Sequence, residues 1–507
     1  MKPTALFSLH DTAYAEIFAA ELIKLGWNII ASRETVNLLQ NHNLPVQDIA
    51  DFTGVKENYG FPPTLHARVE YALTAEGSPH IDMVYIIPYP LSEGNDVGGR
   101  TILALAVKGG RTAVMSIEDM KRVVEELSGT GMVSQKLRME LADKACYQIA
   151  RHYFSLIQDT GRYDCLSGHF ACHLRSGENP YQTPALAFSS GKTDDPLSLT
   201  DFKQVSGDKP CFTNMADADC LLNTLCLATE AFLKNTGSAP YLCVAAKHGN
   251  ACGMGASRIS ALDAVEKALW GNPIAIWGGE VITNFPIDDS LAFALFKSET
   301  REKRLGNGSW MLDVIMAPSF TPEAVSILGK RKERKLIENK ALISPFSITS
   351  GFLYRQVRGG FLRQPPASYI LNLSECKIIG PGFQENAVMS LILAWSVAFS
   401  SSLGGNEVAL AKDGALLSAG GGPSTVAAAK AAVARAIDCG HDTHGSAFAA
   451  DAFFPFTDAP SVLCDAGISL GCVPGGGKNF SSIKDYFLAK SATIAYLPEA
   501  FRGFCRH

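Results

Sequence analysis

The sequence predicts an α/β protein, and three observations point to this class. Residues 1–165 alternate short apolar runs with stretches of helical period, which is the pattern of βαβ units around a parallel sheet. The alternation returns in residues 170–507. The chain is 47% hydrophobic and 19% charged, a composition typical of compact globular proteins. A single core rarely grows beyond about 250–300 residues. The 507 residues therefore predict more than one domain.

The N-terminal domain is predicted from the period of its apolar residues. Runs of four to six apolar or β-branched residues indicate buried strands, and the segments between them have the spacing of amphipathic helices. Residues 158–182 are polar, rich in turn-forming residues and without period, so a loop and the domain boundary are predicted there. Strands are expected at 4–8, 27–31, 83–87 and 111–115, and helices at 12–25, 34–41, 117–127 and 134–157.

The second domain, residues 170–507, is expected to contain two α/β subdomains at about 170–335 and 380–507. Residues 387–399 form the longest apolar run, which has the length of a buried helix. The dense charged run Lys330–Lys335 includes a Glu and has helical spacing, so it is expected to be a solvated helix face.

A glycine run, AGGGPST, begins at Ala419 between an expected strand at 407–411 and an alanine-rich helix at 426–437. Its amides would suit an anion at a helix N-terminus. A tight turn explains the run equally well, and both interpretations stay open.

Charge and cysteine usage exclude several classes of protein. The net charge of −5 and the scattered basic residues give no reason to expect nucleic acid. The 13 cysteines include no C-x-x-C motif, so no metal is predicted, and reduced thiols in the cytoplasm are expected. The N-terminus lacks the pattern of a signal peptide, and no apolar stretch reaches the length of a membrane span, so no membrane association is expected.

The dipeptide Lys247-His248 is the strongest sign of chemistry in the chain. The apolar run Val244–Ala246 predicts a strand that ends at this pair, and Gly249 follows on a glycine-rich turn. A lysine can keep a neighbouring imidazole neutral so that it accepts a proton. The layout therefore indicates proton transfer at a reacting centre.

Several colinear motifs make the chain similar to a known family, the bifunctional 5-aminoimidazole-4-carboxamide ribonucleotide (AICAR) formyltransferase/IMP cyclohydrolase enzymes. The resemblance spans the chain and is looser in the first third. There it is carried by IASRETVNLL, PPTLHA, PYPL and DVGGRTILALAVK; later by LRSGENPYQTPA, FTNMADADC, KHGNACG, IWGGEVITN, DVIMAP, RQVRGGFLRQ, DAFFPFTDA, VPGGGKN and FRGFCRH.

The resemblance implies both a fold and an assembly. It implies an N-terminal methylglyoxal-synthase-like parallel-sheet domain, followed by two cytidine-deaminase-like α/β subdomains. It also implies an intertwined homodimer with transformylase sites at the subunit interface, and no zinc.

The resemblance further implies that a formyl group passes from 10-formyltetrahydrofolate to the 5-amino group of AICAR. His248 matches the family's proton-transferring histidine, and Lys247 matches the lysine that tunes it or stabilises charge. Asn406 matches the asparagine that faces the oxyanion, and an amide N–H is a suitable neutral donor. Taken without the family, Asn406 is better explained as a turn residue before a strand.

Further matches imply the binding of nucleotide and folate. Guanidinium groups suit the 5′-phosphate because their planar fork fits its oxygens. Surface ion pairs, helix caps, turns and core packing are the structural alternatives for these residues. The matches are Arg175, Asn179, Asn214, Asp313 and Arg502 for the nucleotide, and Phe453 and Asp458 for the folate and reacting groups.

The sequence departs from the family pattern around the nucleotide. Gly422 and Thr425 replace a Gln and an Arg, while Ser176 and Tyr181 stand where Tyr and His are usual. The core catalytic set is retained. Substrate and donor preference therefore stay open.

In the N-terminal domain, Tyr89, Asp96 and Lys108 match cyclohydrolase residues. A family lysine is replaced by Pro63, and its neighbouring arginine by Phe61. The two segments that bind phosphate in the family also differ. Here they read Ser8-Leu9-His10-Asp11-Thr12-Ala13-Tyr14 and Ser32-Arg33-Glu34-Thr35. Glu34 places negative charge where phosphate would bind, although Arg33 offers compensation.

Three hypotheses follow. The first is a formyltransferase whose cyclohydrolase activity is lost or altered, for which a separate IMP cyclohydrolase is a candidate partner. The second is a fully bifunctional enzyme that uses replacements such as Arg33 and His10. The third is an inactive paralogue that senses a nucleotide, against which the intact Lys247, His248 and Asn406 argue.

Overall fold

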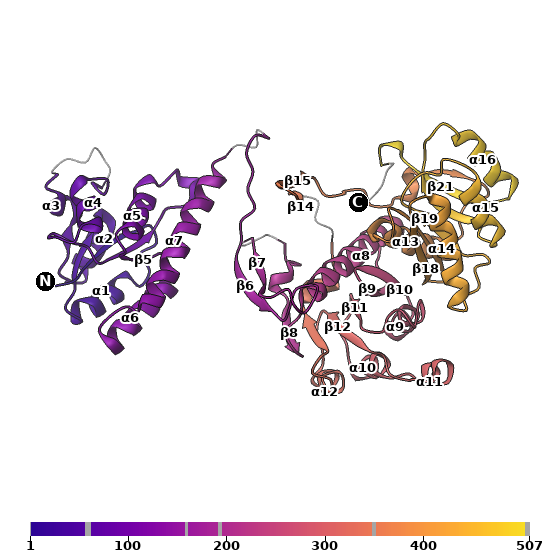
Figure 1. Cartoon of the computed structure of the whole chain (residues 1–507), viewed down its shortest axis with the longest axis horizontal. Coiled ribbons are helices and arrows are strands. Elements are labelled where there is room, and N and C mark those ends of the chain that lie inside the picture. The colour runs from indigo at the N-terminus through magenta and orange to yellow at the C-terminus, as the bar shows by residue number, and fades with distance from the viewer. Residues whose placement is uncertain (1, 56–61, 158–160, 191–194, 347–350, 502–507) are drawn as a thin grey trace. The chain divides into compact units, whose positions relative to one another are not determined.

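The computed structural model describes residues 2–55, 62–157, 161–190, 195–346 and 351–501 (Figure 1). The chain forms two compact units, Met1–Ser167 and Gly168–His507. In the described part of the chain, no helix combines the length and the apolar character needed to cross a membrane.

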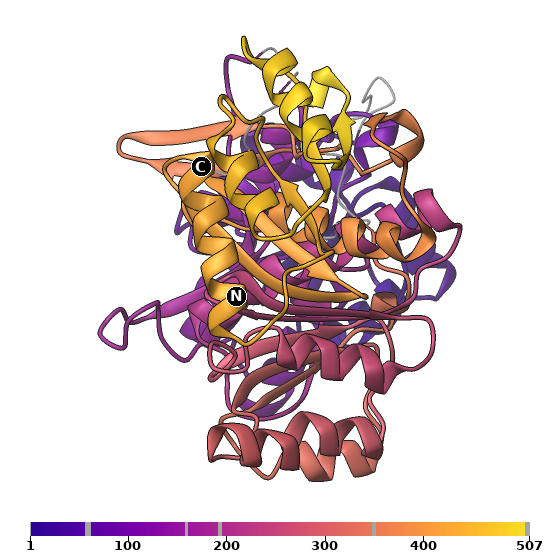
Figure 2. The ribbon, with the colours of Figure 1, turned by 90° about the vertical axis from the view of Figure 1, so that its right-hand side faces the viewer.

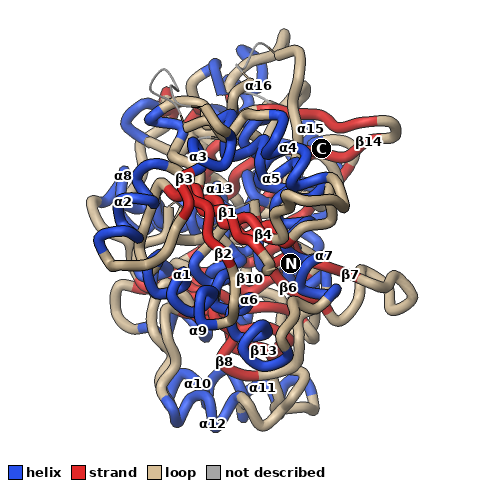
Figure 3. The backbone as a smooth tube through the Cα atoms, turned by 90° about the vertical axis from the view of Figure 1, so that its left-hand side faces the viewer, coloured by secondary structure: helices blue, strands red, loops and turns tan. Residues whose placement is uncertain are grey.

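Unit 1 is built on a parallel five-stranded sheet of order β3-β2-β1-β4-β5. Figure 3 shows β3, β2, β1 and β4 side by side. The strand order reverses direction between β1 and β4, and in such sheets ligands bind at the carboxyl ends next to that point. The strands are β1 (Thr4–Leu9), β2 (Asn28–Ala31), β3 (Gln47–Asp48), β4 (Met83–Ile87) and β5 (Thr112–Val114).

Helices cover both faces of this sheet because alternate residues of each strand point to opposite sides. Phe7 belongs to one buried cluster, with α1 (Ala15–Lys24), α2 (Arg33–Asn41) and α6 (Ile117–Thr130). Leu6 belongs to the other, with α3 (Ile49–Thr53), α4 (Ala67–Thr74) and α5 (Val97–Lys108); α7 (Gln135–Ser155) contributes to both. The parallel α/β fold predicted for this part is confirmed.

Unit 2 contains a mixed twelve-stranded sheet of order β16-β21-β20-β19-β17-β18-β10-β9-β11-β12-β13-β8. The strands from its first half are β8 (Lys203–Ser206), β9 (Tyr241–Lys247), β10 (Asn250–Ser257), β11 (Gly279–Thr283), β12 (Leu312–Ala317) and β13 (Lys335–Glu338). The strands from its second half are β16 (Lys377–Ile379), β17 (Asn406–Lys412), β18 (Ala415–Gly422), β19 (Ala447–Ala450), β20 (Leu470–Pro474) and β21 (Thr493–Leu497).

The sheet of unit 2 is an internal duplication. Each half has a β-hairpin (β9-β10 or β17-β18), three mutually parallel strands (β11-β12-β13 or β19-β20-β21), and an antiparallel strand at the outer edge (β8 or β16). The halves join where β10 pairs antiparallel with β18. In Figure 2 the orange-to-yellow second half lies above the magenta-to-salmon first half.

The helices of the two halves occupy corresponding places in the chain. The first half has α8 (Phe212–Thr236), α9 (Ala261–Trp270), α10 (Asp289–Phe296), α11 (Glu299–Leu305) and α12 (Pro322–Leu328). The second has α13 (Glu385–Ser400), α14 (Thr425–Asp438), α15 (Asp458–Asp465) and α16 (Phe480–Ala489). One long helix precedes each hairpin, α8 or α13, and another helix follows it, α9 or α14. Two small hairpins complete the unit, β6 (His169–Leu174) with β7 (Ala185–Ser189) and β14 (Leu353–Val357) with β15 (Gly360–Gln364).

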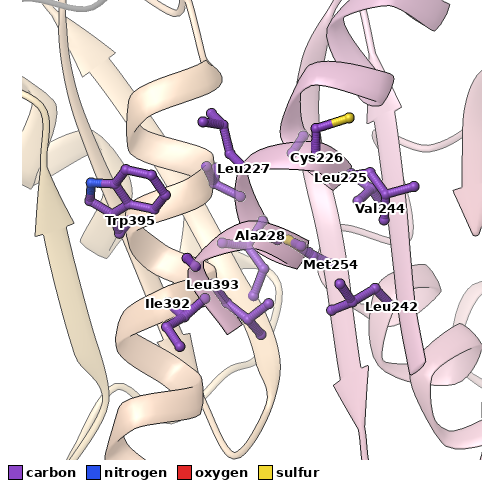
Figure 4. Close-up of a cluster of buried hydrophobic side chains, with 14 of the residues drawn as sticks. Leu225, Cys226, Leu227, Ala228, Leu242, Val244, Met254, Ile392, Leu393 and Trp395 are labelled. Atoms are coloured by element: carbon purple, nitrogen blue, oxygen red, sulfur yellow. The ribbon is translucent and has the colours of Figure 1, made fainter. Parts of the chain in front are cut away.

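The largest core of unit 2 lies where α8 and α13 pack on the sheet. Figure 4 shows Leu227 of α8 and Trp395 of α13 on facing helices, with Val244 and Met254 coming from the strands beside them. Trp395 is fully buried. This core ties the two halves together, because one cluster draws on strands of both.

Replacing Trp395 with alanine is expected to lower the free energy of unfolding of unit 2 by about 3–5 kcal/mol, because it opens a cavity in the shared core. Denaturant titration followed by circular dichroism measures the change. Phe293→Ala is the matched control, since that side chain is 58% exposed and should cost far less. Equal effects of the two substitutions would contradict the packing described here.

Two local predictions are wrong. The loop predicted over 158–182 contains strand β6. Its side chains are mostly exposed, so the segment lacks the apolar period that marks a buried strand, and its pairing with β7 supplies the order.

The charged run Lys330–Lys335 is a turn that leads into β13, and it is not a helix face. Arg334 is buried, and its guanidinium donates to the carbonyls of Trp310 at 3.0 Å, Leu312 at 3.1 Å and Leu328 at 3.2 Å. These three hydrogen bonds satisfy the buried guanidinium. The spacing of charges in the sequence alone predicts that this side chain is exposed to solvent.

In the structure the glycine run allows close packing between β18 and α14. Gly420 lies in β18, where a Cβ atom would come within 2.2 Å of the backbone nitrogen of Ala432 in α14. The hydroxyl of Ser424 caps α14 by accepting from the Ala427 N–H at 3.2 Å. The run thus lets a helix lie directly on a strand.

Candidate functional site

The pair Lys247-His248 lies at the turn of the β9-β10 hairpin. His248 and Gly249 both have positive φ, 55° and 69°, as in the two-residue turns that connect twisted hairpins. Positive φ is uncommon for residues other than glycine, although histidine tolerates it better than most. The His248 N–H donates to Oδ2 of Asp217 at 3.1 Å, and this bond holds the turn. The backbone of His248 is thus held at the edge of the sheet, and the residue is exposed.

Behind this turn lie two buried carboxyl groups, on Asp217 of α8 and Glu280 of β11. Burial, and then the nearby Asp217 carboxylate, raise the pKa of Glu280 to about 9. Burial also raises the pKa of Asp217, although hydrogen bonds from the His248 turn oppose the shift. Asn214 Nδ2 donates to Glu280 Oε1 at 3.3 Å. Near neutral pH Glu280 is therefore protonated next to Asp217.

Sequence reasoning missed Asp217 and Glu280. Both belong to quoted motifs, and Glu280 is an acidic residue in an otherwise buried strand. Acidic side chains are rarely so buried unless they are partnered. That signal was available for Glu280, but 63 residues separate it from Asp217, and the packing of α8 on β11 brings the two together.

Lys247 and Asp313 lie on the same edge of the first half. Lys247 Nζ donates to the carbonyl of Trp277, and the next residue, Gly278, donates to the carbonyl of Met311 at 2.6 Å. Asp313 follows two residues later, near the start of β12, and its charge helps to raise the pKa of Glu280. Lys247, Asp313 and the acid pair thus form one polar group.

Asn406 comes from the second half and lies at the same edge. It is the first residue of β17, and its Nδ2 donates to the carbonyl of Gly422 at 3.2 Å. Three strand steps separate β17 from β9, which is about 14 Å at the usual strand spacing. Asn250 links the two places: its Nδ2 donates to the His248 carbonyl at 2.9 Å, and its Oδ1 accepts from the Ser402 N–H at 2.7 Å.

A second buried carboxyl pair, Glu407 and Asp451, supports Asn406 and was also missed by sequence reasoning. Oε1 of Glu407 accepts from the backbone N–H groups of Leu403 at 2.6 Å and Gly404 at 2.9 Å. Oδ1 of Asp451 accepts from the Glu407 N–H at 2.8 Å. Burial raises the pKa of Asp451 to about 7 and also raises the pKa of Glu407. The pair fixes the loop that precedes Asn406.

The expected nucleotide residues lie around the start of α8. The Arg175 N–H donates to the Pro210 carbonyl at 2.9 Å, and the Phe212 N–H donates to the Ser176 carbonyl at 2.9 Å. Arg175 is exposed and free to turn. Asn214 is the third residue of α8, and its Oδ1 accepts from the Cys211 N–H at 3.2 Å. The structure therefore brings Arg175 and Asn214 to the edge that carries His248.

Asn179 lies in a tight turn, where its backbone N–H and its Nδ2 both donate to Gln182 Oε1, at 2.8 and 2.9 Å. Phe453 and Asp458 follow β19 at the same edge as Asn406, because β19 runs antiparallel to β17. Phe453 is partly buried against Gly477, whereas Asp458 is exposed at the first position of α15. Arg502 lies outside the described residues.

In unit 1 the structure separates the expected residues. Tyr89 and Asp96 follow β4 at the carboxyl edge of the sheet; Tyr89 Oη donates to the Asn95 carbonyl at 3.2 Å. Asp96 caps α5 by accepting from the Gly99 N–H at 2.7 Å. Lys108 is the last residue of this 12-residue helix, about 18 Å along its axis, and lies 3.6 Å from Glu70. Lys108 therefore does not meet Tyr89 and Asp96.

Other polar residues do meet there. His152 Nε2 lies 2.7 Å from Asn95 Oδ1, and Arg100 Nη1 donates to the Asp96 carbonyl at 3.1 Å. Burial, and then the Arg100 charge, lower the pKa of His152. His152 comes from α7, far along the chain from β4, so no local motif points to it.

The two segments that match the family's phosphate-binding segments, residues 8–14 and 32–35, lie at the same edge of unit 1. Ser32, at the N-cap of α2, donates through Oγ to Ser8 Oγ at 3.1 Å. His10 Nε2 lies 3.6 Å from Glu93, and Glu34 is exposed. Phe61 and the side chain of Arg33 lie outside the described residues, while Pro63 is partly buried.

Comparison with known proteins identifies the family. A family model described as AICARFT/IMPCHase bienzyme matches residues 111–435, and one described as MGS-like domain matches residues 15–110. This chain belongs to the AICARFT/IMPCHase bienzyme family. The resemblance drawn from its motifs is confirmed.

Curated relatives agree over nearly the whole length. A bifunctional purine biosynthesis protein PurH from Polynucleobacter asymbioticus is 30% identical over 93% of this chain and 94% of its own. PurH from Acidithiobacillus ferrooxidans is 29% identical over 98% of each chain. A solved structure titled Crystal structure of ForH is 25% identical and covers 31% of this chain and 96% of its own, with a TM-score of 0.27.

In this family member, the described residues contain no group of three or more His, Cys, Asp or Glu side chains placed to hold a metal ion. The His248 edge of unit 2 instead offers an exposed imidazole, an ammonium, amides and buried carboxyls. Such groups can move a proton and bind an oxyanion.

Proposed function

We propose that this enzyme transfers a formyl group from 10-formyltetrahydrofolate to the 5-amino group of AICAR, or of a close analogue, in late purine biosynthesis. The observation that carries the proposal is the His248 turn. The exposed residue His248 has a positive φ, its backbone N–H donates to a buried carboxylate, and it lies beside Lys247 on the edge that Asn406 shares. Backbone conformations of this kind are concentrated at functional sites.

The chemistry follows from the weakness of the nucleophile. The amine of AICAR is conjugated to a ring that carries a carboxamide, so it must lose a proton as its nitrogen bonds to the formyl carbon. His248 accepts that proton. Lys247 and the amide of Asn406 stabilise the oxyanion of the tetrahedral intermediate. Collapse of the intermediate breaks the bond from the formyl carbon to N10 of the folate, and the imidazolium returns a proton to that nitrogen.

The nucleotide binds to Arg175, Asn179, Asn214 and Asp313. Arg175 and Arg502 are the two ligands of its phosphate. Phe453 and Asp458 face the folate. We also propose a cytoplasmic homodimer. The homodimer rests on the family resemblance. Nucleotide binding is supported by the position of Arg175, which is exposed beside the start of α8.

The test of this proposal is a steady-state assay of the full chain with AICAR and 10-formyltetrahydrofolate, in which tetrahydrofolate formation is followed by absorbance. Arg175→Ala is expected to raise the KM for AICAR at least tenfold, with kcat changed less, because the phosphate lies far from the reacting amine. Arg258→Ala is the control, since the Arg258 guanidinium donates to Thr236 and Ser238. Absence of transfer despite nucleotide binding would favour a nucleotide sensor.

For unit 1 we propose that IMP cyclohydrolase activity is lost or altered. Pro63 replaces a family lysine, and Lys108 lies at the far end of α5 from Asp96. A separate IMP cyclohydrolase would then draw the balanced formyl transfer forward. The alternative is a fully bifunctional enzyme, which the names of the relatives favour, with Tyr89, Asp96 and His152 at the carboxyl edge.

Formyl-AICAR distinguishes the two alternatives. We expect the purified chain to close it to IMP no faster than the spontaneous rate, and Tyr89→Phe to change nothing. Chromatographic quantification of IMP measures the rate. Closure well above the spontaneous rate that falls with Tyr89→Phe would establish the bifunctional enzyme.

A further inference from the structure

The duplication in unit 2 places a second, altered copy of the His248 turn at the opposite edge of the sheet. The β17-β18 hairpin turns through Lys412-Asp413-Gly414, where Asp413 and Gly414 have φ of 50° and 75°. This repeats the conformation of Lys247-His248-Gly249. Because β17 and β9 run in opposite directions, the two turns lie at opposite edges.

The residues behind the turn show how the second copy differs. Asp217 is the sixth residue of α8, and the sixth residue of α13 is Ser390. Glu280 of β11 pairs with the residue before Lys247, and Ala447 of β19 pairs with the residue before Lys412. A hydroxyl and a methyl group therefore replace the acid pair. With aspartate in place of histidine, this edge cannot repeat the proton transfer.

A cavity of 380 Å³ lies at this second edge. Its walls come from the first turn of α13, from the Lys412-Asp413 turn and from the starts of β20 and β21. These are the counterparts of the elements that carry the candidate active site. The cavity falls in the size range of small-molecule sites.

Ser390 and Thr493 are buried residues whose hydroxyl groups line the cavity. Ser390 is 4% and Thr493 2% exposed. Among the described residues, neither hydroxyl makes a hydrogen bond. Because both hydroxyl groups open onto the cavity, a ligand there can donate to them or accept from them.

The start of α13 and the side chain of Lys412 provide donors at one end of the cavity. Gln384, at the N-cap of the 16-residue helix α13, makes no side-chain cap, and the Ala387 N–H donates to its carbonyl at 3.0 Å. The two N–H groups before Ala387 remain for an anion. Lys412 Nζ lies 2.8 Å from Asp442, whose side chain is 65% exposed. Asp413 lines the other side and suits hydroxyl groups, which donate to a carboxylate.

We propose that this cavity is a second ligand site, which binds a small phosphate monoester of a hydroxylated molecule, of the size of a sugar phosphate. The phosphate lies at the N-terminus of α13 beside Lys412. The hydroxyl groups of the ligand meet Ser390, Thr493 and Asp413. The site binds without reacting, because it lacks the imidazole and the acid pair of its counterpart.

Calorimetric titration of the full chain with ribose 5-phosphate tests this site. Arg175→Ala serves as the background, so that phosphate binding at the His248 edge is weakened. We expect one ligand per chain. Lys412→Met is expected to weaken binding at least tenfold, whereas Lys430→Met, at an exposed position of α14, leaves it unchanged. No binding in the Arg175→Ala background, or equal binding by both lysine variants, overturns the proposal.

A second variant tests the orientation of the ligand and guards against misfolding. Asp413→Asn keeps a residue that tolerates positive φ. It is expected to weaken ribose 5-phosphate severalfold and to leave inorganic phosphate equal or tighter, since a negative charge is removed. Weakening of both ligands alike overturns the assignment of Asp413. Inorganic phosphate that binds as tightly as ribose 5-phosphate overturns the role of the hydroxyl groups.

Discussion

Replacing His248 with asparagine is expected to abolish formyl transfer while leaving the protein as stable as the wild type. The φ of His248 is 55°, a region in which asparagine and histidine are both several-fold enriched over most other residues. The hairpin turn should therefore form as readily as in the wild type. The imidazole that accepts the proton is lost, and general-base catalysis is typically worth about 10²–10⁴-fold in rate.

Thermal unfolding and the absorbance assay measure the two effects on the same preparation. His42→Asn is the matched control, because His42 is exposed in unit 1, at the end of α2. It should change neither property by much. A His248→Asn enzyme that keeps more than a tenth of the wild-type rate would show that the imidazole is not the base.

The buried acid pair gives the second large effect. Asp217→Ala removes the acceptor that holds the His248 N–H at 3.1 Å, so the turn loses its support and the imidazole its fixed position. We expect kcat to fall about 10²-fold, in line with the cost of misplacing a catalytic group. The KM for AICAR should change less. A kcat within threefold of wild type would contradict the positioning role of Asp217.

Glu280→Gln should instead change how stability depends on pH. The folded-state pKa of Glu280 is about 9, against 4.5 in the unfolded chain. Between these values the folded state binds the extra proton, so this group costs stability as the pH rises from about 5 to 9. Glutamine imitates the protonated carboxyl at every pH. The melting temperature of the variant minus that of the wild type should therefore be several degrees higher at pH 8.5 than at pH 5.5.

Thermal melts at both pH values, with Glu323→Gln as control, check this prediction. Glu323 lies in the first turn of α12, away from the acid pair. A difference between Glu280→Gln and wild type that stays constant with pH would mean that Glu280 is ionised in the folded protein.

The regular elements were predictable because their patterns are local. The alternation of β1, α1, β2 and α2 was correct to within a few residues, and the strand that ends at Lys247 was also found. Buried strands and amphipathic helices carry their period in consecutive residues. The failures at β6 and at Lys330–Lys335 arise where tertiary partners decide the conformation.

The candidate site was predictable only in part. Lys247 and His248 stand out because a base and a cation follow an apolar strand. Asp217 and Glu280 do not, because their importance comes from contact between α8 and β11. The second cavity depends on the duplication, whose two hairpin turns share the short pattern Lys-x-Gly with different residues between.

The most direct test is a single-turnover reaction with the enzyme in excess over AICAR and an isotopic label in the formyl group of 10-formyltetrahydrofolate. We predict that the wild-type chain delivers the label to the 5-amino nitrogen of the nucleotide. His248→Ala should bind AICAR with unchanged affinity and deliver the label at less than one-hundredth of that rate. A nucleotide that stays unlabelled with the wild type, or is labelled equally fast by His248→Ala, would contradict the account.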